Sequence, residues 1–591
     1  MLRRLRRTTL IALLPLLLAT AALAAPKWHT LQAPHCLIVS QLSERETRDW
    51  ASQFEQFTAA LRGVIKIDDR FLPPLTVVLF ANPGSFAPYR PLGPNGKKRE
   101  VTGFFASRDT WSVIGLADSF SDEDTRHIVI HEATHWLVSA TPSQLPLWLN
   151  EGFAEVFSSF EARKDYGLLG QPIPSYVDAL RNTTTWVPLQ QLMLTGSRDR
   201  LYTDNERNRL FYAESWLFVH RLLFLDRAAG FESLNRFFNA RLRGADQLTA
   251  FVAAFGKDTV AADSDLEHYL RKGGFGLTKL PFPPEAKVGA PFEPATPLAV
   301  EIALARLALG SERNEQARLH IARALALDTA TAAPYELLAL LEYQMKNTPA
   351  STAAARQALA RGTRDGGMHM LVAQDIWQAQ SARGSLDTAA REIADHFARA
   401  IELQPKLQIA YTNFACIAPL LPKGTEADAL LLISGYKIFP GSADLLVGLA
   451  ALLHKDKNEA EAQRFLTLAL SHPENLTQDQ RIQAENMRAE WAIQPRLERI
   501  EALVQERNFR EALAVCVALL QEPMPMRYHQ QLERRRNDLR FTVTLEEAEH
   551  AENSTEAIRI LDSLDTQPGL SQYQQRLIRE SRERHRRNQE Q

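Results

Sequence analysis

The segment DEDTRHIVIHEATHWLVSA contains the residues of this chain that are best suited to chemistry. His131 and His135 are four residues apart, so on a helix their imidazoles lie on one face and can converge on a single metal ion. Glu132 lies beside them, where a carboxylate can take a proton from a water that the ion has made more acidic. The spacing therefore predicts a zinc site, Zn2+ being the cofactor, with its own general base for hydrolysis at a carbonyl group.

A helix that happens to be rich in histidine is the alternative. With 15 histidines and 70 acidic residues in 591, an accidental His-Glu-x-x-His is expected in roughly one to three of 100 such chains, so the motif alone is not decisive. His127, one turn before His131, has no acidic neighbour of the catalytic kind. We expect His127 to be structural or to support a ligand, and not to bind the metal.

A catalytic zinc needs a third protein ligand, and Glu151 is the candidate. It belongs to LWLNEGFAEVFSSF, which the pattern predicts to be a second helix after a short turn. Its large apolar neighbours indicate a buried face, where a lone carboxylate would be costly. Glu155, one turn further, is expected to accept a hydrogen bond from a ligand imidazole, although a solvated helical glutamate explains it nearly as well.

These residues resemble a known family. HEATH followed by LPLWLNEGFAEVF is similar to the gluzincin metallopeptidases, and WLNEGFA to the aminopeptidase N group, in which the corresponding glutamate, here Glu151, is the third zinc ligand. The shorter spacing is closer to the compact peptidase MA-like proteins, which are often exported and fused to tetratricopeptide repeats. The resemblance covers roughly residues 28–280 and is specific only within 131–155.

The resemblance extends to LFYAESWLFVHRLL, where the family has a tyrosine that opens a later helix. It implies that the Tyr212 hydroxyl stabilises the oxyanion of the reaction intermediate, with Ser215 at the family's small position; a developing oxyanion does need such a donor. A buried structural tyrosine is the alternative. His220, two turns further, is expected to be structural.

One departure from the aminopeptidase pattern bears on the activity. Those enzymes carry a G-x-M-E-N strand whose glutamate holds the free amine of the substrate, whereas TGFFASRDTW has Gly103 but no matching glutamate. The departure implies an endopeptidase and makes an aminopeptidase less probable. An edge strand at about Trp111 to Leu116 is expected to be able to align a peptide by strand addition.

The elements before residue 280 follow an α+β order. HCLIVS and LTVVLFA are typical of strands, the second ending at a turn NPGS, and a helix is expected between them after a cap at Ser43. VTGFFASRDTWSVIGL reads as a hairpin, and most segments from Asp122 to about Leu280 look helical. With the resemblance, this order predicts an α+β gluzincin (thermolysin-like) metallopeptidase domain over residues 25–280.

The proline-rich segment 281–297 is predicted to be a linker, and residues 298–591 an all-α solenoid of the tetratricopeptide type. Pro405, Pro440 and Pro473 end similar helical segments and are 35 and 33 residues apart, close to the period of about 34 residues of tetratricopeptide repeats. A generic α-bundle is the alternative. Stacked helix pairs of this kind usually bind an extended peptide or another protein.

The N-terminus predicts export. Residues 1–24 combine a basic start, a short apolar core and a small-residue cleavage signal at Ala24, which is typical of a secretory signal peptide; the alternative is a membrane anchor, for which the apolar run is short. The three cysteines indicate no disulfide framework, and the net charge of −2 gives no reason to expect nucleic acid. A periplasmic or secreted protein without a stable membrane span follows.

Together these patterns predict an exported zinc metallopeptidase. In this hypothesis His131, His135 and Glu151 bind zinc, Glu132 is the general base, Tyr212 stabilises the oxyanion and the helical repeats bind a protein partner or the substrate. The alternative is a non-catalytic interaction scaffold that uses its repeats and keeps a vestigial metal site.

Overall fold

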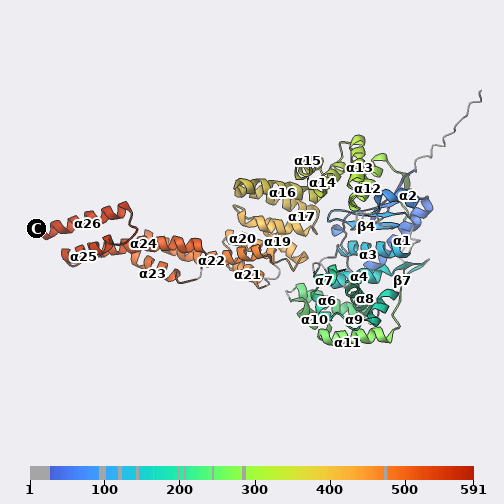
Figure 1. Ribbon diagram of the computed structural model, residues 1–591, viewed down its shortest axis with the longest axis horizontal. Coiled ribbons are helices and arrows are strands. Elements are labelled where there is room, and N and C mark those ends of the chain that lie inside the picture. The colour runs from blue at the N-terminus through green and yellow to red at the C-terminus, as the bar shows by residue number, and fades with distance from the viewer. Residues whose placement is uncertain are drawn as a thin grey trace, which may run out of the picture. The chain divides into compact units, whose positions relative to one another are not determined.

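The computed structural model divides the chain into two compact units (Figure 1). The first comprises the described residues up to Gln378 together with Arg399–Leu407, and the second comprises Ala379–Ala398 and the described residues from Gln408 onward. The described residues are 27–91, 101–117, 123–141, 145–163, 165–196, 199–204, 208–225, 227–242, 245–281, 288–471, 476–522 and 524–590. The signal peptide predicted at residues 1–24 therefore lies outside them.

A mixed sheet of six strands lies at the centre of the first unit, in the order β4-β5-β3-β2-β1-β9. Its parallel centre is made by β2, β3 and β5, while β1, β9 and β4 pair antiparallel with their neighbours. The strands are β1 (His29–Gln32), β2 (Cys36–Ser40), β3 (Leu75–Leu79), β4 (Gly103–Ser107), β5 (Ser112–Leu116) and β9 (Phe292–Pro294). The predicted strands around HCLIVS and LTVVLFA and the predicted hairpin are thus confirmed.

Helices cover both faces of this sheet. As a result, every residue of the central strands β3 and β5 is buried. On one face α1 (Glu44–Arg62) buries Trp50 and Phe54 in the same core as Ile38 and Ile114. Ser43 caps α1 with a complete capping box, as the sequence predicted. On the other face α12 (Pro297–Gly310) packs against β2, β3, β4 and β5.

The described residues of the proline-rich segment 281–297 include strand residues and the start of a helix, which corrects the prediction of a linker for this part. β8 (Thr278–Pro281) pairs with β7 (Tyr166–Leu169) in a small second sheet completed by β6 (Glu161–Ala162), and β9 pairs with β1. Pro281 and Pro294 stand at strand ends, where a missing N–H does not interrupt a ladder. The domain boundary expected near residue 297 also differs from the structure. α12 packs on the second face of the sheet, and the first unit continues to Gln378.

Two smaller expectations also differ from the structure. The strand expected at the edge of the sheet, β5, is an inner strand between β3 and β4, so β4 is the edge. The turn expected at NPGS opens the short helix α2 (Pro83–Phe86), because the Asn82 side chain accepts a hydrogen bond from the Ser85 amide and caps it.

The remaining described helices of this part of the chain follow β5 in sequence, as the α+β order predicted, and β9 joins the sheet after them. The helices that carry the candidate site are α3 (Glu123–Val138), α4 (Leu147–Ser158), α7 (Arg200–Thr203) and α8 (Asn208–Phe224). The others are α5 (Pro174–Asn182), α6 (Leu189–Leu194), α9 (Arg227–Leu242), α10 (Gln247–Phe255) and α11 (Thr259–Lys272).

From α12 onward the described residues form only helices, most of them in antiparallel pairs (Figure 1). They are α12, α13 (Asn314–Leu327), α14 (Ala333–Gln344), α15 (Thr348–Leu359), α16 (Gly366–Arg383), α17 (Leu386–Leu403), α18 (Gln408–Ile417), α19 (Glu426–Ile438), α20 (Ala443–Lys455), α21 (Glu459–Leu470), α22 (Gln478–Gln505), α23 (Phe509–Leu519), α24 (Met526–Glu549), α25 (Ser554–Asp565) and α26 (Gln572–Glu590). Pro405 and Pro440 follow the ends of α17 and α19 as predicted, while Pro473 lies outside the described residues.

A recurring turn shows that these pairs are structural repeats. The residue that leads from the first helix of a pair into the second has a left-handed backbone, with φ near 60° in Glu312, Lys346, Lys457 and Arg507 and 67° in Gly384. Left-handed backbone is rare in residues other than glycine and costs about 1 kcal/mol or more. Its recurrence at the equivalent place in five pairs indicates one shared turn geometry, and Glu312 and Lys346 are separated by one repeat period.

Cys36, Cys416 and Cys516 are free. Within the part of the chain that the structure describes, no helix combines the length and the apolar character needed to cross a bilayer.

Candidate metal centre

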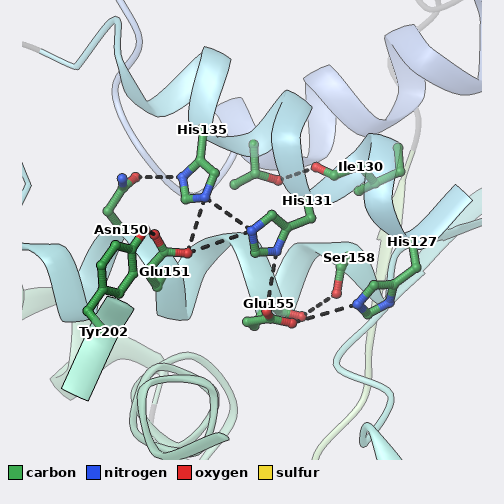
Figure 2. Close-up of polar contacts among 10 residues, drawn as sticks. His127, Ile130, His131, His135, Asn150, Glu151, Glu155, Ser158 and Tyr202 are labelled. Atoms are coloured by element: carbon green, nitrogen blue, oxygen red, sulfur yellow. Dashed lines mark hydrogen bonds and ion pairs between the residues drawn. The ribbon is translucent and has the colours of Figure 1, made fainter. Parts of the chain in front are cut away.

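Two adjacent helices bring His131, His135 and Glu151 together (Figure 2). The histidines lie one turn apart on α3, and Glu151 comes from the facing first half of α4. The His135 Nε2 atom is 3.2 Å from the Glu151 Oε2 atom and 3.2 Å from His131 Nε2, and His131 Nε2 is 3.6 Å from the same Glu151 oxygen. Three ligand-type atoms thus form a nearly equilateral triangle.

The size of this triangle fits a zinc ion. Ligand atoms about 2.0–2.1 Å from a tetrahedral ion lie about 3.3–3.4 Å from one another. The three observed separations of 3.2, 3.2 and 3.6 Å scatter around that value. The three residues occupy three positions of such an ion and leave the fourth for a water or a substrate atom.

The other ring nitrogen of each imidazole has its own acceptor. His135 Nδ1 is 3.2 Å from the Asn150 side-chain oxygen, and His131 Nδ1 is 3.4 Å from Glu155 Oε1. If both Nδ1 atoms carry the ring proton, both Nε2 lone pairs face Glu151 Oε2, an oxygen that is buried and has no hydrogen-bond donor. Metal-binding histidines are typically held in this way, through an N–H on the far side of the ring.

The charges around the histidines are consistent with a site that needs a cation. Burial lowers the pKa of His131. Burial also acts to lower the pKa of His135, but the close contact with Glu151 and the charge of that carboxylate outweigh it and raise that pKa. A single proton between His135 and Glu151 would still leave the His131 Nε2 lone pair facing them, whereas one metal ion satisfies all three atoms.

Glu155 and His127 lie behind the triangle. Besides its contact with His131, Glu155 has its Oε2 atom 3.7 Å from His127 Nε2 (Figure 2). Glu155 is buried, so it is not the solvated glutamate of the alternative hypothesis. His127 contacts Glu155 and is outside the group of three, which agrees with the expectation that it does not bind the metal.

Glu132 and Tyr212 interact electrostatically with the residues of the triangle. The Glu132 charge acts to raise the pKa of both histidines, although burial outweighs it at His131. Tyr212 lies on α8, and burial, followed by the charge of Glu151, raises the pKa of its hydroxyl to about 12. Tyr212 therefore stays protonated at neutral pH and is available as a hydrogen-bond donor.

Helices α4 and α8 approach closely at Gly152, the residue after Glu151. A Cβ atom at position 152 would lie 2.5 Å from the Ser215 carbonyl oxygen and would also overlap Val219. Ser215 is fully buried at this crossing, so its small side chain serves the packing of the two helices. Residue 152 must be glycine for the metal-binding helix and the tyrosine helix to keep this distance.

A Gly152→Ala variant is expected to lose about 3 kcal/mol of unfolding free energy, because the added methyl group meets backbone that cannot move aside. Urea unfolding of the variant and the wild type measures the loss. Gly441→Ala is the control, since a Cβ there meets open space. Equal unfolding midpoints for Gly152→Ala and the wild type would contradict this account of the crossing.

Two further side chains of this region are structural. His220 is buried and its ring nitrogens contact the Tyr269 hydroxyl and the Gly170 carbonyl at 2.9 Å each, so burial lowers its pKa to about 4. This agrees with the structural role expected from the sequence. Glu214, also buried on α8, accepts a hydrogen bond of 2.8 Å from the Val187 amide, and burial raises its pKa to about 8.

The raised pKa of Glu214 predicts a pH-dependent stability. Between pH of about 4.5 and about 8 the folded chain keeps a proton that the unfolded chain releases, so this contribution is present at low pH and is lost as pH rises. A Glu214→Gln variant should lack this trend. The unfolding free energy of the variant minus that of the wild type should therefore increase by about 1.4 kcal/mol per pH unit in that window. Unfolding midpoints from pH 5 to 8 measure this difference, and Glu392→Gln, at an exposed position, is the control. Parallel pH curves for Glu214→Gln and the wild type would contradict the prediction.

Two contributors to the centre were missed by sequence reasoning. Asn150 directly precedes the ligand glutamate, and its side chain could have been suspected from that position. Tyr202 on α7 donates a hydrogen bond of 2.9 Å to Glu151 Oε1. Nothing in the local pattern around Tyr202 marks it, because its partner lies 51 residues earlier in the chain.

Fold and site thus define a chain with an HExxH-type candidate metal centre beside a mixed sheet, followed by paired helices. No family model matches this chain. No curated protein matches it either.

Solved structures with partial similarity are helical-repeat proteins. YrrB, described as a TPR protein with an unusual peptide-binding site, has 17% identity and a TM-score of 0.25, over 31% of this chain and 90% of its own. Yeast Tom70 has 15% identity and a TM-score of 0.19, over 70% of this chain and 82% of its own. The human IFIT1 dimer with PPP-AAAA has 12% identity and a TM-score of 0.19, over 70% and 94%.

The all-α repeat part of the sequence-based prediction is supported by the helix pairs of this structure, and the comparisons include no support for the gluzincin part. TM-scores of this size do not establish a shared overall fold. What the chain does must therefore be argued from its own geometry.

Proposed function

We propose that this chain is a zinc-dependent metallopeptidase whose metal is held by His131, His135 and Glu151. The observation that carries the proposal is the triangle of ligand atoms, with separations that suit zinc and with an acceptor behind each imidazole. A bound zinc supplies Lewis-acid chemistry, polarising a substrate carbonyl and making water more acidic. The presence of Glu132 beside the triangle supports a peptidase over a purely structural metal site, whose four positions would all be filled by protein.

The residues around the metal have distinct roles in this proposal. Glu132 accepts a proton from the attacking water and passes it to the leaving amine, as a general base and then a general acid. Tyr212 donates a hydrogen bond to the oxyanion that develops on the substrate carbonyl, which is supported by its protonated state at neutral pH. Asn150 and Glu155 hold the two imidazoles in the orientation that turns Nε2 toward the metal.

We propose an endopeptidase activity on peptide or protein substrates. The edge strand β4 carries Gly103 and has no glutamate of the kind that holds a free amino terminus in the aminopeptidase pattern. β4 packs beside α3 and has one free edge among the described strands, where a peptide in extended conformation can pair with it.

Metal analysis combined with hydrolysis of a denatured protein tests this function. Purified wild-type chain should contain about one zinc per molecule, lose hydrolysis on treatment with a chelator and recover it when zinc is added back. Absence of zinc after purification from zinc-containing medium would overturn the proposal. A cleavage-site screen of a whole proteome against the wild type and Glu132→Gln would then define the substrates.

A second candidate function is that of an interaction scaffold built on the helix pairs. It is favoured by the repeated turn geometry and by the partial similarity to helical-repeat proteins, one of which is described as peptide-binding. On the comparisons alone this alternative has more support than the peptidase. The two functions separate in a complementation test: a scaffold works equally well with Glu132→Gln, and a peptidase does not. In either case we propose that the helix pairs bind a protein partner or the substrate.

The proposed location is the periplasm or the exterior of the cell. It rests on the signal peptide expected at residues 1–24, with cleavage after Ala24. Sequencing the N-terminus of the protein recovered from the exported fraction tests it, since Ala25 should be the first residue.

A further inference from the structure

We infer that Tyr202 is a positioning residue of the proposed metal centre, and that it keeps Glu151 facing the metal through one oxygen only. The inference rests on the proposed zinc site. It concerns a residue that lies outside the HExxH and NEG motifs and that belongs to a different helix, α7.

The two oxygens of Glu151 have different surroundings. Oε2 faces His135 Nε2 at 3.2 Å and His131 Nε2 at 3.6 Å and has no hydrogen-bond donor. Oε1 points away from them and accepts the hydrogen bond from the Tyr202 hydroxyl, at 2.9 Å (Figure 2). One oxygen is thus left for the metal, and the other is already occupied.

The Tyr202 ring is held in place by its neighbours. It packs edge-on against the buried Phe211 ring, with centroids 5.6 Å apart, and lies 6.0 Å from the Tyr212 ring. The Tyr202 amide is bonded to the Asp199 carbonyl at 3.0 Å, which fixes the turn that carries it. A hydroxyl on a ring held this firmly can hold the carboxylate that it contacts.

A hydrogen bond to the outer oxygen changes how a carboxylate binds a metal. Without a donor on Oε1, Glu151 can rotate and use both oxygens, which fills the coordination position that a substrate atom needs. With the donor in place, binding through one oxygen is favoured and the open position is preserved. Such supporting contacts are typically worth about 10–100-fold in metal affinity or activity.

The Tyr202 ring also lies beside the ring of Tyr212, the proposed oxyanion donor. The Tyr202 hydroxyl therefore contacts a proposed metal ligand, and its ring adjoins the residue proposed to act on the substrate. Loss of this hydroxyl is expected to affect the metal and the catalytic turnover together, and to leave substrate affinity less affected.

The test is Tyr202→Phe in the full-length chain, which removes one oxygen atom and keeps the ring. The variant should release zinc to a chelator about 10–100-fold faster than the wild type. With Co2+ in place of zinc, its visible absorption should weaken and shift, as expected when a four-coordinate ion gains a further ligand oxygen. Tyr343→Phe, the same change at an exposed position of α14, is the matched control and should match the wild type.

The outcomes distinguish this inference from the function on which it rests. If the wild type binds zinc and Co2+ but Tyr202→Phe has the same release rate and the same Co2+ spectrum, Tyr202 has a purely structural role and the inference is wrong. If the wild type binds neither ion, the proposed function itself fails. Faster release with an altered Co2+ spectrum, at unchanged circular dichroism, supports the inference.

Discussion

If the proposed function holds, a Glu132→Gln variant of this chain is expected to bind zinc as the wild type does and to hydrolyse peptides about 10²–10⁴-fold more slowly. The amide fills the same space, but it cannot accept the proton of the attacking water. Because Glu132 is not part of the ligand triangle, the metal content should stay near one per chain. Initial rates on a denatured protein, measured beside zinc content by mass spectrometry, give both quantities.

The control for this experiment is Glu267→Gln, the same chemical change at an exposed position of α11. It should leave the rate unchanged. Full hydrolysis by Glu132→Gln would exclude Glu132 as the base, and hydrolysis that survives in both variants and in chelator would point to a contaminating protease. Loss of zinc from Glu132→Gln would mean that this residue holds the metal.

The second large effect concerns the two buried glutamates of α4, which lie one turn apart and form a matched pair. Glu155→Gln should weaken zinc binding by about 10–100-fold, because it removes only the charge behind His131. Glu151→Gln should weaken it by much more, because it replaces a charged ligand by a neutral amide. Competition with a chromogenic chelator measures both affinities.

Unfolding temperatures provide a second comparison of the Glu151 and Glu155 variants. Zinc stabilises the folded chain by about 2.7 kcal/mol when it is present at 100 times its dissociation constant, and chelation removes that amount. The wild type should therefore show a lower unfolding temperature in chelator, and Glu151→Gln should show almost no difference between zinc and chelator. If zinc raises the unfolding temperature of Glu151→Gln and Glu155→Gln equally, Glu151 does not bind the metal as proposed.

The candidate site was largely predictable, because helical spacing is a local property. Four-residue steps bring His131 near His135 and Glu151 near Glu155, and a short connection forces α3 and α4 to pack together. The capping box at Ser43 is equally local. Each of these features depends only on residues that are close in sequence.

What could not be predicted depends on contacts between distant segments. Tyr202 meets Glu151 because α7 packs against α8, and the spacing of residues along the chain does not predict such a contact. The strands β1 and β9 are four and three residues long; they pair with one another, and β1 also pairs with β2. The prolines around β9 were therefore interpreted as a linker, since composition was the available signal.

The helical repeats also have a local sequence pattern at their turns, which is independent of the proline spacing. Lys346, Lys457 and Arg507 are each followed by an asparagine at the N-cap position of the second helix of the pair. A basic residue and asparagine between two helical segments therefore mark the turn in this chain. This signal locates pairs that have no proline just after their second helix, such as α14 and α15.

The antiparallel pairing of β1 with β9 has a consequence for how the protein folds during its synthesis. β1 begins at His29 and meets its outer neighbour only when the ribosome has added about 260 further residues. The same stretch of synthesis precedes α12, which covers the second face of the sheet. Until then, an apolar sheet face and a strand edge are exposed, and both are templates for aggregation. We therefore expect the nascent chain to depend on a holding chaperone until β9 and α12 have been synthesised.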